Sequence, residues 1–105
     1  MITRITIDSE DTIIITRNSI RYEGAREKWI VKDVSPSFEQ MFDNLVSEIE
    51  KLISINQEQD GEMTVFTLKH DDGKKERYTT ILAEEEYAIC FTIIDKMIRD
   101  GRAHD

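Results

Sequence analysis

The sequence predicts one α+β domain, in which a single antiparallel sheet of four to five strands carries two helices on one face. Isoleucine outnumbers leucine by 16 to 4, and this bias favours strands because a β-branched side chain packs well on a pleated surface. Short segments that alternate apolar and polar residues come first, and two segments with helical spacing occur later in the chain. The expected order is strand, strand, a short third strand, helix, strand, strand, helix.

Polar turns separate the candidate strands that precede the first helix. These strands are Ile2–Ile7, Thr12–Arg17, Ile20–Tyr22 and Lys28–Val34. The segments between them are Asp8–Asp11, Asn18-Ser19 and Glu23–Arg26. They are rich in Asp, Asn, Ser and Gly, which favour turns because they hydrogen-bond their own backbone or tolerate unusual dihedral angles. This region therefore predicts a run of antiparallel strands.

The first helix has a clear start and one apolar stripe. Ser35 followed by Pro36 offers a side-chain oxygen at the cap and a fixed φ in the first turn, and Ser37 with Gln40 offers a second capping arrangement. The stripe has spacings of three and four and predicts about five helical turns. Its members are Phe38, Met41, Phe42, Leu45, Val46, Ile49, Leu52 and Ile53. The polar segment Asn56–Gly61 is expected to end the helix.

A hairpin and a second helix are expected to complete the domain. Glu62–Lys69 and Lys75–Leu82 alternate around a turn at Asp71–Gly73. The acidic run Glu84–Glu86 suits the first turn of a helix, where the helix dipole favours negative charge. The inner stripe is expected to contain Tyr87, Cys90, Phe91, Ile94, Met97 and Ile98. Gly101 is the expected end of this helix, and residues 101–105 are expected to be a frayed tail of the single domain, residues 1–105.

Charge and composition exclude several classes of function. The 105 residues carry a net charge of −8, which argues against general binding to nucleic acid or to an anionic membrane. A single cysteine excludes an internal disulfide and a thiolate zinc site. The N-terminal segment lacks the continuous apolar run of a secretory signal, and no segment has the length of a membrane span. We therefore expect a cytoplasmic protein.

The negative charge is concentrated in the helices. Residues 36–62 have a net charge of −6 and residues 83–105 of −3, whereas residues 1–35 are neutral and residues 63–82 carry +1. If Ile5, Ile20 and Leu68 face the core, a period of two turns Arg4, Arg21 and Lys69 outward. We therefore expect a bipolar molecule, with a basic open sheet face and an acidic helix face. The alternative is an ordinary solvated surface that binds no partner.

The segment Thr12–Thr16 is apolar on both faces, because Ile13 and Ile15 point one way and Ile14 the other. We expect a central strand whose outer Ile14 lies beneath long neighbours, in a monomer. A homodimer through the Ile13–Ile15 strand or through the sheet face is the alternative.

Candidate catalytic and metal-binding groups have ordinary structural explanations. His70 to Gly73 match a hairpin turn, Cys90 lies on a predicted inner face, and the three glutamates at 84–86 point in different directions around a helix. Tyr22, Tyr78 and Trp29 offer side chains that could line a pocket or stack on a base, but a lone tryptophan in a small domain is more often a core anchor. The sequence holds no glycine-rich phosphate loop and no Ser/His/Asp or Cys/His spacing. We therefore expect no catalytic residues, no metal and no cofactor.

The expected function is a non-enzymatic protein-interaction module, such as a small acidic inhibitor, an immunity-type protein or a regulator. Glu39, Asp43 and Glu50 share one flank of the first helix and are the candidate contacts for a basic protein partner. The alternative is a binder of a small or anionic ligand on the open sheet face. Its candidate contacts are Arg4, Arg21 and Lys69.

Overall fold

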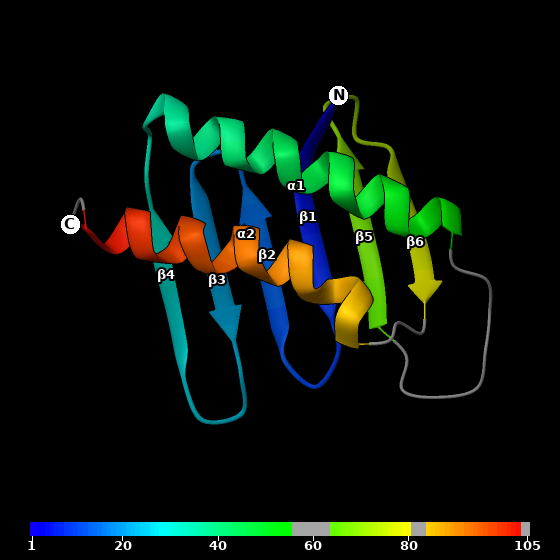
Figure 1. The fold of residues 1–105 in the computed structure, drawn as a ribbon, viewed down its shortest axis with the longest axis horizontal. Coiled ribbons are helices and arrows are strands. Elements are labelled where there is room, and N and C mark those ends of the chain that lie inside the picture. Colours follow the sequence, from blue (N-terminus) through cyan, green and yellow to red (C-terminus); the bar gives the residue numbers. More distant parts are fainter. Residues whose placement is uncertain (56–63, 81–83, 104–105) are drawn as a thin grey trace.

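A six-stranded antiparallel sheet carries two long helices on one face, so the predicted α+β class is confirmed (Figure 1). The computed structural model describes residues 1–55, 64–80 and 84–103. The strands are β1 (Ile2–Asp8), β2 (Thr12–Thr16), β3 (Ser19–Glu23), β4 (Lys28–Lys32), β5 (Thr64–His70) and β6 (Lys75–Thr80). The helices are α1 (Pro36–Ile55) and α2 (Glu84–Ala103). The expected end of the first helix at Asn56–Gly61 lies outside the described residues.

The sheet has the strand order β4-β3-β2-β1-β5-β6. All four candidate segments before α1 form strands, whereas the expected order counted only two and a short third. The short segment Ser19–Glu23 pairs with neighbours on both sides and is a full strand. β1 lies near the middle and pairs with β2 and with β5. β2 lies between β1 and β3, which confirms the central position expected for the Thr12–Thr16 segment. Its backbone is therefore not available for pairing with a second chain.

A β-bulge near the start of β1 explains why two residues three positions apart both face the core. The register shifts between Ile2, which pairs with His70, and Arg4, which pairs with Lys69. Ile2 and Ile5 are both buried, at 8% and 0% exposed. An extra residue in one strand reverses the alternation of faces, so Ile2 returns to the core side.

The core lies between the sheet and the two helices. From α1 it takes Phe38, Met41, Phe42, Leu45 and Ile49, and from the sheet Ile5, Ile7, Ile15, Ile20, Val31, Phe66 and Leu68. Both helices cross the same face in front of the strands (Figure 1). Within the described residues, no helix covers the opposite face of the sheet, and we call it the uncovered face.

Side-chain and backbone hydrogen bonds fix the start of α1 at Pro36. Ser35 Oγ accepts a hydrogen bond from the amide of Phe38 at 3.3 Å, which is the expected N-cap. The amide of Ser35 itself donates to Asp33 Oδ1 at 2.8 Å. Asp33 is buried at 6% exposure, and its carboxylate orders the turn from β4 into the helix.

Two expectations for α2 are wrong. The helix continues through Gly101 to Ala103, because Gly101 lies against Val31 of β4 so closely that a Cβ there would overlap Val31 Cγ1. The glycine therefore permits close helix–sheet contact rather than ending the helix. Phe91 is 42% exposed instead of buried, since the buried stripe runs through Cys90, Ile94 and Met97 and Phe91 lies about 100° around the helix from Cys90.

Candidate functional site: the uncovered face of the sheet

The side chains on the uncovered face form three rows that run across the strands. The first row contains Lys75, Lys69, Arg4, Thr16, Ser19 and Lys32. The second contains Arg77, Thr67, Thr6, Ile14, Arg21 and Ile30. The third contains Val65, Asp8, Thr12, Glu23 and Lys28. Rows form because directly paired residues in neighbouring strands point to the same side of the sheet.

The first two rows hold six basic side chains and no acidic one. We call this set the basic band: Lys75, Lys69, Arg4, Lys32, Arg77 and Arg21. At about 4.8 Å between strands, the six strands spread the band over about 24 Å, and the two rows lie about 7 Å apart. Such an area matches a macromolecular surface better than a single small ion.

Like charges lie directly opposite one another within the basic band. Lys69 pairs with Arg4 on one side and with Lys75 on the other, so three cations stand side by side on adjacent strands. Among the described residues, no carboxylate forms an ion pair with any member of the band. Cross-strand like charges destabilise a sheet. The fold therefore tolerates a local electrostatic cost at this surface.

The opposite end of the same face is acidic and better compensated. Asp8 and Glu23 stand in the third row, and Asp8 Oδ1 accepts a hydrogen bond from the Thr12 hydroxyl at 2.9 Å. The uncovered face is thus polarised from a basic end to an acidic end.

Tyr22 and Trp29 lie on the other side of the sheet, because Tyr22 is paired with Ile13, which packs against the core. The Tyr22 hydroxyl donates a hydrogen bond to Asp11 Oδ2 in the turn between β1 and β2. This hydrogen bond, together with burial and the negative charges of Asp11 and Glu27, raises the pKa of Tyr22 above its ordinary value. Tyr22 also stacks on Trp29, with ring centroids 5.3 Å apart and planes inclined by 14°.

The three residues predicted for anionic ligand binding share this face. Arg4 and Lys69 are direct partners across β1 and β5, whereas Arg21 lies on β3, separated from β1 by β2 and displaced into the second row. Lys32, Lys75 and Arg77 complete the band and were not among the predicted contacts. A period of two also turns these three side chains outward, but their alignment with Arg4 depends on the strand order and register, which the sequence does not specify.

The acidic candidates on α1 differ in their surroundings. Glu39, Asp43 and Glu50 are all exposed. Asp43 forms an ion pair at 2.8 Å with Arg17 from the β2–β3 turn, and the Arg17 guanidinium also lies 5.3 Å from the centre of the Phe42 ring. One of the three charges is therefore already neutralised within the molecule, and its partner holds the turn against the helix.

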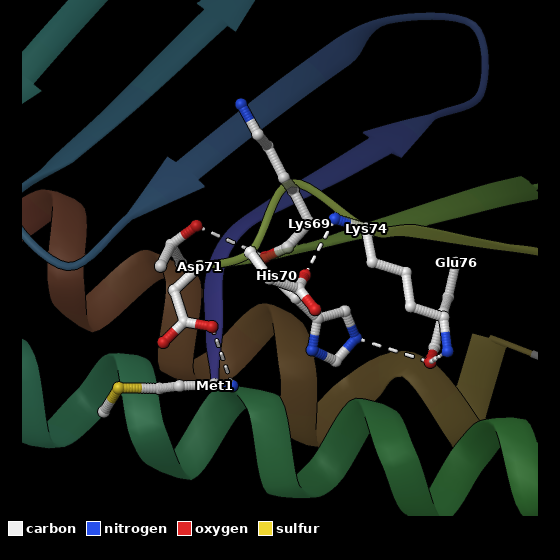
Figure 2. Close-up of polar contacts among 8 residues, drawn as sticks. Met1, Lys69, His70, Asp71, Lys74 and Glu76 are labelled. Carbon is white, nitrogen blue, oxygen red and sulfur yellow. Dashed lines mark hydrogen bonds and ion pairs between the residues drawn. The ribbon is translucent and has the colours of Figure 1, made fainter.

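The His70–Gly73 segment has the structure of a hairpin turn. Gly73 has a positive φ of 90°, its amide bonds the His70 carbonyl at 3.0 Å, and the Lys74 amide bonds Asp72 Oδ1 at 2.9 Å. His70 Nε2 lies 3.4 Å from Glu76 Oε1. Figure 2 shows this pair on the side of the sheet that faces α1, whereas the Lys69 side chain points the other way. The imidazole and the basic band therefore lie on opposite faces.

Cys90 is buried in the core, as expected, at 2% exposure. Burial, with a smaller contribution from the negative charge of Glu48, raises the pKa of its thiol to about 11. A nucleophile needs a thiolate, so this environment suppresses reactivity at neutral pH.

Two shallow depressions lie at one end of β3 and β4. One of about 480 Å³ is lined by Asp11, Tyr22, Ala25, Arg26 and Glu27. The other, of about 250 Å³, is lined by Arg21, Tyr22, Glu23, Lys28, Trp29 and Ile30. Neither is lined by Arg4 or Lys69, so these two predicted contacts do not converge in either hollow.

The described residues show no metal site and no membrane-spanning helix, and comparisons with known proteins find no match. Within residues 1–55, 64–80 and 84–103, no group of three or more His, Cys, Asp or Glu side chains is arranged to hold a metal ion. Over the same ranges, neither helix has the length and apolar character required to cross a bilayer. The chain matches no protein-family model, no curated protein and no solved structure.

Proposed function

We propose that this protein is a non-enzymatic interaction module that binds an acidic protein surface through the basic band. The observation that carries the proposal is the row Lys75–Lys69–Arg4, in which like charges stand directly opposite one another without an acidic partner among the described side chains. A partner carboxylate placed over this row would relieve the repulsion. Binding would thus be favoured by the removal of a repulsion that destabilises the unbound protein.

Two features favour a protein over a nucleic acid as this partner. The described residues on the uncovered face include no aromatic side chain, so the face offers no platform on which bases could stack. The molecule carries a net charge of −8, which repels a long polyanion wherever the polyanion extends beyond the band. A compact acidic patch about 24 Å wide avoids this repulsion, because the acidic helices lie on the other face.

The proposal moves the expected binding surface from the helices to the sheet. On α1, the Arg17–Asp43 ion pair already satisfies part of the acidic flank that includes Glu39 and Glu50. On the sheet, the charges lack such partners among the described residues. A binding site with uncompensated charge gains more from a complementary partner than one with internal ion pairs.

A matched pair of charge variants tests the proposal. The triple variant Arg4→Gln/Lys69→Gln/Arg77→Gln removes three charges from the basic band. The control Lys51→Gln/Lys96→Gln/Arg99→Gln removes three exposed charges from the helices, so both variants have the same net charge. The probes are a labelled ten-residue peptide with six glutamates and a labelled 15-nucleotide oligothymidylate, both measured by fluorescence anisotropy at low and high salt.

We expect the peptide to bind the unmodified protein and the control with similar affinity. The band variant should bind about tenfold more weakly, since three exposed ion pairs contribute about 0.5 kcal/mol each. Equal weakening by both variants, or no binding of the peptide at all, would refute the basic band as the site. Tighter binding of the oligothymidylate than of the peptide would reject an acidic protein in favour of a nucleic acid.

A further inference from the structure

The free edge of β4 presents the backbone groups of three residues. The Asp33 amide bonds the Asn18 carbonyl and the Gly24 amide bonds the Glu27 carbonyl, each at 2.9 Å, in line with the β3–β4 register. Hydrogen bonding alternates along an antiparallel strand. Trp29 and Val31, which lie between Glu27 and Asp33 at intervals of two, therefore bond to β3. The N–H and C=O groups of Lys28, Ile30 and Lys32 point outward, where the sheet ends.

The side chains of these same three residues lie on the uncovered face. Lys28 and Lys32 are exposed, and Ile30 between them is 44% exposed. Lys32 belongs to the basic band, and its ladder partner is Ser19; Lys28 faces Glu23 without an ion pair. The edge therefore shows a cation, an apolar side chain and a second cation at intervals of two, with three sets of outward backbone groups beside them.

We propose that the β4 edge binds an extended acidic segment of a partner protein by strand addition. In an antiparallel addition, the partner residues directly opposite Lys32, Ile30 and Lys28 exchange backbone hydrogen bonds with them. The matching pattern is acidic–x–apolar–x–acidic, in which the two carboxylates meet the lysines and the apolar side chain covers Ile30. This inference rests on the proposed function for the acidic character of the partner and adds the form in which the partner binds.

The same charges disfavour a two-fold pairing of this edge with a second copy of the chain. A two-fold antiparallel pairing of β4 with β4 about Ile30 would place Lys28 of each copy opposite Lys32 of the other. Like charges directly opposite destabilise such a pair. Lysines on an edge strand also discourage pairing with uncharged strands, so the edge selects an acidic strand.

The depression of about 250 Å³ lies beside this edge, since Arg21, Lys28, Trp29 and Ile30 contribute to its lining. Its position allows the apolar side chain of an added strand to contact more than Ile30 alone. The Arg21 side chain stands next to Ile30 in the second row of the uncovered face. An added strand would thus extend the sheet directly beside one end of the basic band.

The first test uses the peptide Thr-Glu-Thr-Ile-Thr-Glu-Thr with blocked ends, in three forms. One form is unmodified, one is N-methylated at the central isoleucine, whose N–H would face β4, and one is N-methylated at the neighbouring threonine, whose N–H would face away. We expect the unmodified peptide to slow amide hydrogen exchange at Ile30. Methylation at isoleucine should weaken binding about tenfold, whereas methylation at threonine should leave the affinity within about twofold.

The second test compares the β4 edge with lysines on the helices, outside the basic band. Lys28→Thr/Lys32→Thr should weaken binding of this peptide about fivefold, whereas the control Lys51→Gln/Lys96→Gln, which removes two exposed charges from the helices, should have little effect. Equal effects of the two methylations, or protection on β6 rather than β4, would overturn strand addition. If this peptide fails while the glutamate-rich peptide still binds the basic band, only the present inference fails; if neither binds, the proposed function fails as well.

Discussion

Gly101→Ala is expected to destabilise the protein, although glycine-to-alanine changes inside helices usually stabilise. Alanine has a helix propensity about 0.8–1.0 kcal/mol more favourable than glycine. At Gly101, however, the new Cβ would overlap Val31 Cγ1 and come within 3.8 Å of Asp33 Cβ. Val31 is 2% exposed and β-branched, so its side chain cannot rotate away freely.

The expected magnitude follows from these opposing contributions. Overpacking of a buried contact costs about 1–3 kcal/mol, and near the end of a helix the gain in propensity is at most about 1 kcal/mol. The net change in the free energy of unfolding should be a loss of about 1 kcal/mol, equivalent to about 4 °C in Tm. Urea denaturation followed by the fluorescence of Trp29 and by circular dichroism measures it.

A double-mutant cycle with Val31→Ala identifies the cause. Val31→Ala removes the overlapping methyl group and costs about 2 kcal/mol by itself. In that background Gly101→Ala should become neutral or stabilising, with a coupling of about 1–2 kcal/mol. If Gly101→Ala raises the urea midpoint of the unmodified protein, the end of α2 does not press on β4 and the packing argument is wrong.

Three further predictions concern charge and ionisation. Lys69→Gln should raise the free energy of unfolding by about 0.5 kcal/mol, because it removes the repulsion of Lys69 by Arg4 and Lys75. The increase should be largest at low salt, and a lower free energy of unfolding at every salt concentration would contradict this repulsion. Raising the pH from 9 to 11 should lower the free energy of unfolding by up to about 3 kcal/mol through Cys90. The unfolded thiol ionises near pH 9, whereas the folded thiol stays neutral until its pKa of about 11, so the stabilisation present below pH 9 is lost over this range. Urea denaturation over this range should show a smaller loss in Cys90→Ala. Asp11→Asn should lower the pKa of Tyr22, measured by ultraviolet absorbance of tyrosinate, and an unchanged titration would show that the hydrogen bond is not its main cause.

The sequence was sufficient to predict the fold class and nearly all of the elements. Local signals determine the start of α1, where Ser35 caps the helix, and the hairpin turn at Gly73. They fail where a distant segment decides the outcome. Gly101 has the composition of a helix end, but its contact with Val31, 70 residues earlier, makes it an interior helix residue.

The candidate site was predictable only in part, for a related reason. A period of two places Arg4 and Lys69 on the same side as Arg21, and the structure confirms this face. Which of these cations stand next to one another depends on pairing between β1 and β5, and nothing local specifies that pairing. The direct pairing of Arg4 with Lys69 in the ladder, and hence the row of cations without acidic partners among the described residues, could not be derived from the sequence.

The position of β1 has a consequence for the order of folding. Ile5 pairs with Ile15 across a separation of 10 residues, but with Leu68 across 63. Closing the longer loop costs about 1.6 kcal/mol more chain entropy. The four-stranded meander can therefore assemble from local hairpins, while the β1–β5 ladder must wait until α1 brings the second hairpin back. Folding of this domain should be limited by that long-range closure, and the rate should respond to changes at the β1–β5 ladder more than to changes at the β3–β4 turn.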